Sequence, residues 1–366
     1  MGHPFADAPG PLRSLNAARV VALPDELATD DVIGRRGVEL VSGLWLGREL
    51  AGRASELGLD PESFQLPRDF AGCLTNRDVP ASARALAGDI ALRLGRRLGC
   101  LLLMLSRGER ANRAARPDWG DEQWRLWAGV RRVVIGGGLL AGAIGDVALP
   151  AAQAVLDAYD AGHVRLARSP WGDGIALVGL ARLLPVAAEQ RGVLDFGQTS
   201  VKRGVARYRA GRLASLRVLP ARPCFCPSPI GLSTERAEIE RQWEAMLDLT
   251  VETAREAGSR PGDAAEVSIC LACYLRDGRP DPLDARSCYG RLQALGPDLA
   301  ELAGSRLADR LGSEVRFQLL DDGTAAALAV EPDETCVVLT IGTAIGVGFP
   351  LARHPRAPLE HGSRLV

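Results

Sequence analysis

The sequence is poor in lysine, in aromatic residues and in long apolar runs. Lys202 is the only lysine among 44 basic residues, and aromatic residues make up 5% of the chain. The formal net charge of −1 gives no reason to expect nucleic acid or an anionic membrane as a partner. No apolar run reaches the ~20 residues that span a bilayer, and residues 1–12 contain no apolar signal core. These absences favour a cytoplasmic protein without nucleic-acid or membrane partners.

The chain has the length and apolar content of a protein with two domains. It has 366 residues, of which 47% are hydrophobic. Apolar residues recurring every three or four positions predict helices over 38–54, 82–106, 239–251 and 295–311. Short apolar runs predict strands at 132–136, 164–167, 267–274 and 315–320, and 205–219 alternates as an antiparallel pair with a turn at Ala210-Gly211. The mixture predicts an α/β protein. Trp119, Trp124 and Trp127 are interpreted as packing anchors, with a binding stripe as the alternative.

A glycine-containing hairpin lies in the middle of the chain, over residues 193–204. An apolar strand leads into Asp195, then Gly197, Gln198 and Thr199, and a second strand-like run follows. Glycine lets the backbone approach an anion, N–H and hydroxyl groups donate to it, and a carboxylate holds a metal through water. The segment indicates a phosphate-binding hairpin. An ordinary turn is the alternative, because D-x-G-x-T is a short pattern.

Three further segments suit the same chemistry. The strand 132–136 runs into Gly136, Gly137 and Gly138, and glycines at the carboxyl end of a strand let a ligand lie against backbone. Residues 336–348 give a strand, a turn containing Gly342 and Thr343, and another strand. A third strand, 315–320, delivers Asp321 and Asp322 to a helix of alanines. Chance explains one of these segments more easily than all of them.

The eight cysteines form no obvious framework. Cys224, Cys226, Cys270 and Cys273 have a spacing that a four-thiolate zinc site also has. However, residues 267–274 are predicted to be a strand, in which positions three apart point to opposite faces. The thiols are therefore interpreted as buried or incidental, and no zinc site is expected.

Together these segments resemble the ROK family of sugar kinases, within the actin-like ATPase superfamily. Members carry D-x-G-x-T, then an N-D-A-N-like segment before an alanine helix, then G-T-G-x-G-x-G, and later a V-I-G-G-G strand. Residues 195–199, 321–325, 342–346 and 134–138 are similar to these four motifs in turn, and residues 171–176 are similar to the segment that ends such chains.

The motifs stand in the family's order only if the chain is read as a circle from residue 193. The resemblance therefore implies a circular permutation of two ribonuclease-H-like (actin-like ATPase) lobes with a cleft between them. It assigns residues 1–189 and 335–366 to a C-type lobe and residues 190–334 to an N-type lobe. Cuts at exposed loops preserve a fold, so such a rearrangement is physically acceptable.

The resemblance also implies roles for individual residues. Asp322 matches the catalytic base, and Asp195 would position Mg²⁺ through water. Gly197, Gln198 and Thr199, with Gly342 and Thr343, would hold the phosphates of ATP, and Gly136 to Gly138 would lie along the adenosine. The substrate side would comprise Glu360, Asp321 and Ser363. The alternative for the acidic pair is a helix N-cap followed by a first-turn acid.

Two departures from the family pattern affect the sugar pocket. Glu360 and Gly362 align with a G-E-x-G-H segment, but Ser363 stands where the family has its sugar-contacting histidine. Residues 34–37 keep glycines of the family's zinc motif beside Ile33 and Val38 in place of cysteines.

The sequence therefore predicts ATP-dependent, Mg²⁺-dependent phosphorylation of a hydroxyl on a sugar, amino sugar or cyclitol, in a protein that the resemblance also makes a possible homodimer. The alternative is a catalytically weak or inactive relative that binds a sugar or nucleotide as a sensor. The retained Asp195 and Asp322 favour the enzyme, whereas Ser363 and the missing cysteines favour the sensor. A nucleotide hydrolase without a sugar acceptor is a third, more distant reading.

Overall fold

The computed structural model describes residues 3–5, 10–186, 188–225, 232, 235–276, 278–284, 287–360 and 365. The chain divides into two compact units. Unit 1 comprises residues 1–8, 12–173 and 334–347, and unit 2 comprises residues 9–11, 174–333 and 348–366. Each unit is therefore built from segments that are far apart in the sequence.

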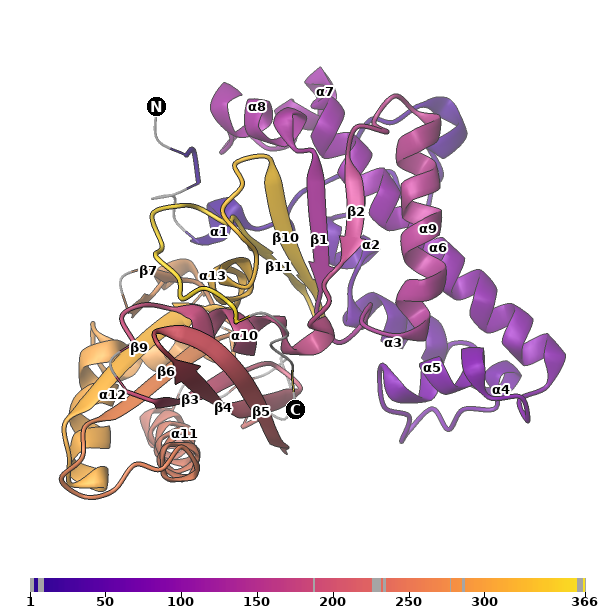
Figure 1. Ribbon diagram of the computed structural model, residues 1–366. Helices are drawn as coiled ribbons and strands as arrows, with labels where there is room; N and C mark the ends of the chain where they lie inside the picture. Colours follow the sequence, from indigo (N-terminus) through magenta and orange to yellow (C-terminus); the bar gives the residue numbers. More distant parts are fainter. Residues whose placement is uncertain are drawn as a thin grey trace. The chain divides into compact units, whose positions relative to one another are not determined.

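Unit 1 contains a four-stranded sheet in the order β11-β10-β1-β2. Its strands are β1 (Arg132–Gly136), β2 (Arg165–Arg168), β10 (Cys336–Ile341) and β11 (Ile345–Gly348). The central strand β1 pairs in parallel with β2 on one side and with β10 on the other, with Val134 opposite Val338. The sheet thus joins a strand from the first half of the chain to strands near its end (Figure 1).

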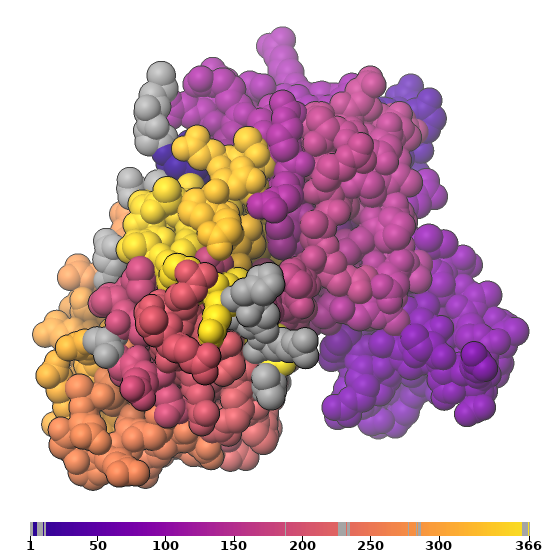
Figure 2. Space-filling view, in the orientation of Figure 1, coloured from indigo at the N-terminus to yellow at the C-terminus, as the bar shows by residue number. Residues whose placement is uncertain are grey.

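The helices of unit 1 pack closely, and its longest helix confirms the prediction for 82–106. That helix is α6 (Ala81–Arg107), which packs against α9 (Ala143–Ala158). The two helices approach so closely at Gly95 and Gly99 that a side chain at either position would clash with α9. Residues of α4, α5 and α6 lie in the purple part of the surface in Figure 2. The others are α2 (Gly37–Leu40), α3 (Gly43–Ala51), α4 (Ala54–Leu57), α5 (Arg68–Thr75), α7 (Arg110–Ala114) and α8 (Asp121–Gly129). A short helix, α1, covers Gly10–Arg13.

Two sequence predictions for unit 1 have clear outcomes. The single helix predicted over 38–54 is wrong, because α2 ends at Leu40 and a separate helix, α3, begins after Ser42. The Ser42 side chain caps α3 by accepting a hydrogen bond from the N–H of Trp45 at 3.1 Å. The tryptophans are packing anchors, as predicted. All three are buried, and the Trp119 ring lies 5.1 Å from Trp124 and 6.2 Å from Trp127 between ring centroids.

Unit 2 contains a five-stranded mixed sheet in the order β5-β4-β3-β6-β9. An antiparallel meander comprises β3 (Gln190–Phe196), β4 (Ser200–Arg209) and β5 (Arg212–Pro223). It is extended on the β3 side by the parallel strands β6 (Ala265–Leu271) and β9 (Val315–Asp321). The predicted turn at Ala210-Gly211 is confirmed, with positive φ at both residues. A short separate ladder pairs β7 (Leu275–Arg276) with β8 (Arg279–Pro280).

Helices cover both faces of this sheet. Alternate residues such as Leu194, Ile269 and Leu319 pack into one core with α11 (Arg236–Glu256) and α12 (Leu299–Leu311). The intervening residues, which include Asp195 and Cys270, point to the other face. The helices α10 (Ile175–Arg182) and α13 (Asp322–Leu328) contact each other and strands of the same sheet. The carboxyl ends of β3, β6 and β9 therefore meet beside the start of α13.

The observed division of the chain differs from the predicted one. The prediction placed a boundary at 189/190 and residues 335–366 in a single lobe, whereas the units change at 173/174 and again at 347/348. Every residue of α10 is buried, and this helix contacts α13 and β3. Residues 348–366 likewise belong to unit 2, where Leu359 bridges to Leu213. A helix that is apolar on all sides is stable only between other elements, which explains why α10 belongs with the unit whose sheet it covers.

Among the described residues, no helix combines the length and the apolar character that a membrane span requires.

Candidate functional site

Asp195 lies at the carboxyl end of β3 among polar groups of the neighbouring strands. It pairs with Cys270 on β6 and with Lys202 on β4. The Cys270 thiol donates to Asp195 Oδ1 at 3.4 Å, and Lys202 Nζ lies 3.6 Å from Asp195 Oδ2. The residue is only 8% exposed. A buried carboxylate held by two donors is a fixed acceptor, which suits binding a cation through water.

The turn that follows Asp195 requires glycine at its first position. A Cβ on Gly197 would lie 2.9 Å from the backbone oxygen of Ser200, too close for any side chain to enter without a shift. The N–H of Gly197 donates to the carbonyl of Asp195 at 3.1 Å. Gln198 is half-buried and Thr199 is exposed. The turn is therefore tight and open to solvent on its outer side.

Asp321 and Asp322 lie where β9 passes into α13. Asp321 is the N-cap of α13: Oδ1 accepts from the N–H of Thr324 and Oδ2 from its hydroxyl, each at 2.8 Å. Asp322 is the first helical residue, and its Oδ1 accepts from the N–H of Gly323 at 2.9 Å. The alternative reading, an N-cap followed by a first-turn acid, thus describes both residues, and Asp322 is the acid of the pair whose carboxyl does not cap the helix.

The environment of Asp322 favours its protonated form. Burial of the carboxyl is the main cause, followed by the negative charges of Asp321 and Asp195, and together they raise its pKa from 3.8 to about 8. The residue as a whole is half-buried, and it is the carboxyl group itself whose burial raises the pKa. A carboxyl with a pKa near neutral exchanges protons at the pH of a cell, which is what a general base requires.

These acids fit a cation held mainly through water. Three carboxyls near one another carry negative charge that a divalent cation would neutralise. Among the described residues, no three His, Cys, Asp or Glu side chains come close enough to hold a metal directly. Mg²⁺ keeps several of its waters and often binds one or two protein carboxylates together with substrate phosphates. Asp195 has the position for that role, at the carboxyl end of β3 beside the turn.

Cys270 belongs to this cluster as a thiol. Burial, and next the charge of Asp195, raise the pKa of Cys270 well above its ordinary value. The sulfur therefore keeps its proton and donates a hydrogen bond to Asp195. Cys273 lies in the core on the other face of the sheet. Cys224 lies 3.3 Å from the hydroxyl of Tyr289, and Cys226 lies outside the described residues. Cys270 and Cys224 thus lie in different surroundings, the first beside Asp195 and the second beside Tyr289 and Cys288.

Unit 1 brings the other two predicted glycine segments together. Gly136 pairs with Thr340, and a Cβ on Gly137 would lie 2.6 Å from the backbone nitrogen of Ile341. Gly137 has a φ of 90°, a conformation that favours glycine. The triple-glycine turn and the turn containing Gly342 and Thr343 therefore lie side by side, at the carboxyl ends of two neighbouring parallel strands.

The second turn is fixed from outside by residues that sequence reasoning did not single out. The N–H of Gly43, at the start of α3, donates to the carbonyl of Gly342 at 2.7 Å. The side chain of Asn16 donates to the carbonyl of Ile345 at 2.8 Å and accepts from its N–H at 2.9 Å. This pair of hydrogen bonds imitates a backbone ladder and sets the position of the chain directly after the turn.

The structure does not bring Glu360 to the acidic cluster. Its N–H donates to the carbonyl of Leu213 at 2.9 Å, and its Oε1 lies 3.3 Å from Arg209 Nη1. Arg209 ends β4, seven residues beyond Lys202, which corresponds to roughly 23 Å along a strand. Glu360 therefore lies toward the opposite end of the sheet from Asp195, and the predicted joint contact of Glu360 and Asp322 with one substrate has no support within unit 2. Ser363 lies outside the described residues.

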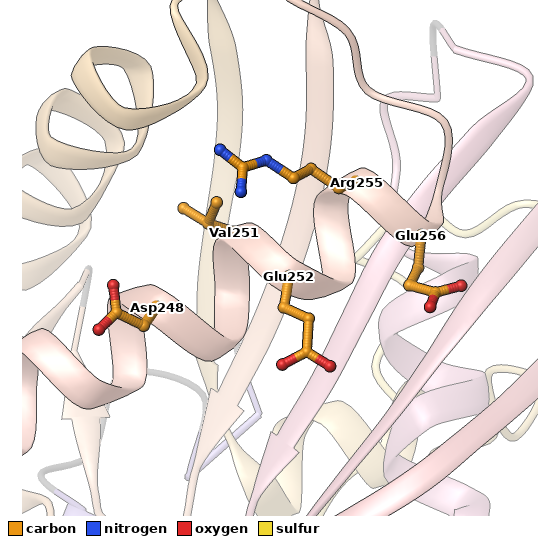
Figure 3. Close-up of a pocket in the computed structure, with 5 residues that line it drawn as sticks. All are labelled: Asp248, Val251, Glu252, Arg255 and Glu256. Atoms are coloured by element: carbon orange, nitrogen blue, oxygen red, sulfur yellow. The ribbon is translucent and has the colours of Figure 1, made fainter.

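A cavity on α11 is unrelated to the acidic cluster. It has a volume of about 590 Å³ and is lined by Asp248, Val251, Glu252, Arg255 and Glu256. Figure 3 shows that all five side chains come from one helix. Its three acids are already paired with arginines: Asp248 with Arg310, Glu252 with Arg203 and Arg222, and Glu256 with Arg217. Its charges are compensated, so we assign it no catalytic role.

The contacts of Asp195 include two residues that the sequence reasoning left out. No role was expected for Lys202, and Cys270 was among the thiols interpreted as buried or incidental; it is buried. The spacing of the hairpin contained a signal for Lys202, because a four-residue connection between positions 196 and 201 places residues 195 and 202 opposite each other. Cys270 lies on a strand 75 residues away, and nothing in the local sequence gives its register.

Comparisons with known proteins add a partial structural similarity. No protein-family model matches the sequence, and no curated protein matches it. A crystal structure of an inorganic polyphosphate/ATP-glucomannokinase from Arthrobacter sp. strain KM is similar to part of the chain, with a TM-score of 0.27 and 20% sequence identity. The similarity covers 44% of this chain and 57% of that one. The function is therefore argued from the residues and their geometry.

Proposed function

We propose that the protein is a kinase that transfers a phosphoryl group from ATP to a hydroxyl of a sugar, amino sugar or cyclitol. The observation that carries this proposal is the acidic cluster of unit 2, where Asp322 has a pKa of about 8 beside Asp195 and Asp321. Phosphoryl transfer needs a base near the acceptor hydroxyl, a metal and donors to the phosphates. The residues of this cluster and of the adjacent turn are of the types that supply these needs.

Asp322 is assigned the role of general base. Its carboxylate would take the proton of the acceptor hydroxyl as that oxygen attacks the γ-phosphorus of ATP, and ADP would leave. Asp321 keeps its capping hydrogen bonds to Thr324 and thereby fixes the start of α13, from which Asp322 projects. A bound Mg²⁺ would neutralise phosphate charge, and Asp195 would orient it through water. Lys202, next to Asp195, provides a positive charge at the same end of the sheet.

The glycine turns are assigned to ATP. In unit 2, Gly197, Gln198 and Thr199 would donate to phosphate oxygens. In unit 1, Gly342 and Thr343 form a turn of the same kind, and its proposed role is also to bind phosphate. Gly136 to Gly138 would accommodate the adenosine, because a turn without side chains permits close approach. The strand order of unit 2, a three-stranded meander extended by two parallel strands, supports a ribonuclease-H-like lobe. The pairing of β10 with β1 supports a circular permutation, since it joins strands from opposite parts of the chain.

A sensor that binds a sugar or nucleotide without turnover is the second candidate, and the position of Glu360 favours it. This residue is paired with Arg209 rather than placed beside Asp322. A kinase whose acceptor pocket lacks this contact would bind its sugar differently or not at all.

Formation of ADP in the presence of a panel of sugars, amino sugars and cyclitols separates the two candidates. The kinase proposal predicts that at least one acceptor raises ADP production above the rate with ATP alone, and that EDTA abolishes the increase. Binding of ATP measured by calorimetry, with no acceptor raising turnover, would instead support the sensor. A protein that binds neither ATP nor ADP contradicts both.

A further inference from the structure

Three carbonyl groups in and beside the turn after Asp195 accept hydrogen bonds from other segments of the chain. The N–H of Ala272 donates to the carbonyl of Phe196 at 3.0 Å, and the N–H of Cys224 donates to that of Thr199 at 3.3 Å. The hydroxyl of Tyr289 donates to the carbonyl of Gly197 at 2.8 Å. In the part of the chain that the structure describes, the N–H groups of Gln198 and Thr199 donate no hydrogen bond. The turn thus has the carbonyls of Phe196, Gly197 and Thr199 engaged and two N–H donors available.

Such an arrangement suits an anion. Successive backbone N–H groups that point away from the fold form a concave site for phosphate oxygens. Their direction depends on the peptide planes of the turn, and the plane between Gly197 and Gln198 contains both the Gly197 carbonyl and the Gln198 N–H. A donor that fixes the carbonyl therefore fixes the direction of the amide on the other side of the same peptide.

Tyr289 is well placed to be that donor. It is 0% exposed, and its ring meets Phe196 edge to face, with 6.1 Å between centroids. Burial raises the pKa of Tyr289 far above its ordinary value, so the hydroxyl keeps its proton. Because the hydroxyl hydrogen is used in the bond to the Gly197 carbonyl, the hydroxyl oxygen accepts a hydrogen bond from the thiol of Cys224, whose sulfur lies 3.3 Å away. The thiol of Cys224 thus supports the orientation of the Tyr289 hydroxyl.

We propose that Tyr289 is a positioning residue for nucleotide binding, which acts through the peptide between Gly197 and Gln198. This inference rests on the proposed function, because it takes the turn to be a phosphate turn. Tyr289 touches no substrate. Its hydroxyl holds one carbonyl of the turn so that the neighbouring amide points toward the nucleotide's phosphate oxygens.

Tyr289→Phe removes only the hydroxyl, and Tyr208→Phe is its matched control. The Tyr208 hydroxyl donates to the carbonyl of Ala181 at 2.6 Å, and this residue lies toward the other end of β4, next to Arg207, which pairs with Gln190. Both substitutions delete a hydrogen bond from a tyrosine to a backbone carbonyl in unit 2, so they have similar effects on stability. Only the first touches the turn.

We expect Tyr289→Phe to weaken the binding of Mg·ADP and to raise the KM for ATP by roughly fivefold to tenfold, the factor given by one hydrogen bond, with kcat little changed. We expect Tyr208→Phe to leave both values unchanged. In the protein without nucleotide, hydrogen exchange at the hydrogen-bonded amides of the turn, those of Gly197, Cys224 and Ala272, should be faster in Tyr289→Phe and unchanged in Tyr208→Phe. Cys224→Ser should keep the wild-type KM, since serine retains a donor to Tyr289.

Equal nucleotide binding and equal exchange in Tyr289→Phe and wild type would overturn the inference. Equal loss in both tyrosine variants would also overturn it, because the effect would then be one of general stability. If the wild type binds no nucleotide, the proposed function fails. The exchange measurement still decides whether Tyr289 fixes the turn, since it needs no ligand.

Discussion

Asp322 combines two properties that are useful only together: its carboxyl titrates near neutral pH, and Asp321 rather than Asp322 caps the helix. Burial and the charges of Asp321 and Asp195 raise the Asp322 pKa to about 8. Carboxyls in this range act as acids or bases because each protonation state is populated near the working pH. At the scale of a residue, the capping by Asp321 and the charge of Asp195 thus make Asp322 a plausible base.

The pH profile follows from that assignment. A general base must be ionised, so kcat/KM for the acceptor should rise with pH and level off above the Asp322 pKa of about 8. The expected slope on the acidic side is about tenfold per pH unit. Steady-state rates between about pH 6 and 9 measure it. A flat profile in the wild type over that range would remove Asp322 from the role of base.

At the scale of elements, the junction of α10 and α13 sets where α13 begins. A Cβ on Gly179 of α10 would lie 1.7 Å from the backbone oxygen of Ala325 of α13. Both helices contact the same sheet, and α13 starts at Asp322. The lack of a side chain at position 179 is therefore what lets α13 approach the sheet and place its first residue near Asp195.

Gly179→Ala should destabilise the protein, although alanine is the better helix former. We expect a loss of about 1–3 kcal/mol from overpacking, together with a fall in kcat, because α13 must move. The control is Gly88→Ala in the interior of α6, where a Cβ would meet no atom within 4 Å. That change should stabilise by about 0.5–1 kcal/mol. Urea unfolding measures both variants, and stabilisation by Gly179→Ala would contradict the packing described here.

Local patterns predicted most elements, because periodicity and turn residues are properties of neighbouring positions. The helix over 82–106, the hairpin turn at Ala210-Gly211 and the passage from strand to alanine helix at Asp321 are confirmed. The contacts of Asp195 with Cys270, and of Gly197 with Tyr289, were not predicted. They depend on strand register and on packing across the sheet, which no local pattern contains.

At the scale of the whole molecule, each unit draws its sheet or its covering segments from both halves of the chain. In unit 1, β1 pairs with β10, and in unit 2, residues 348–360 join elements that begin at Gly174. The sequence predicted two parts but placed the boundary after α10, because a helix's neighbours in space cannot be read from its own residues. The position of Glu360 was not predicted either, because it is set by contact with Arg209, which lies 151 residues away in the sequence.

A permutation of the chain tests the proposed circular order. The ends at Val366 and Met1 would be joined by a flexible Gly/Ser linker of ~20 residues, and the chain opened within residues 185–189. We expect this variant to fold, with a cooperative unfolding transition and wild-type nucleotide binding. A second variant opened inside β6 should fail to fold, since β6 pairs on both sides. If the first variant unfolds as readily as the second, the proposed order is wrong.

The most direct test of the central claim is the turnover of Asp322→Asn with ATP, Mg²⁺ and the acceptor that best stimulates the wild type. Asparagine keeps the size of the side chain and cannot accept a proton. The account predicts that kcat falls by about 10²–10⁴-fold, the usual contribution of a general base, while the affinity for Mg·ATP stays within a few-fold of the wild type. An Asp322→Asn variant that turns over at the wild-type rate would contradict it.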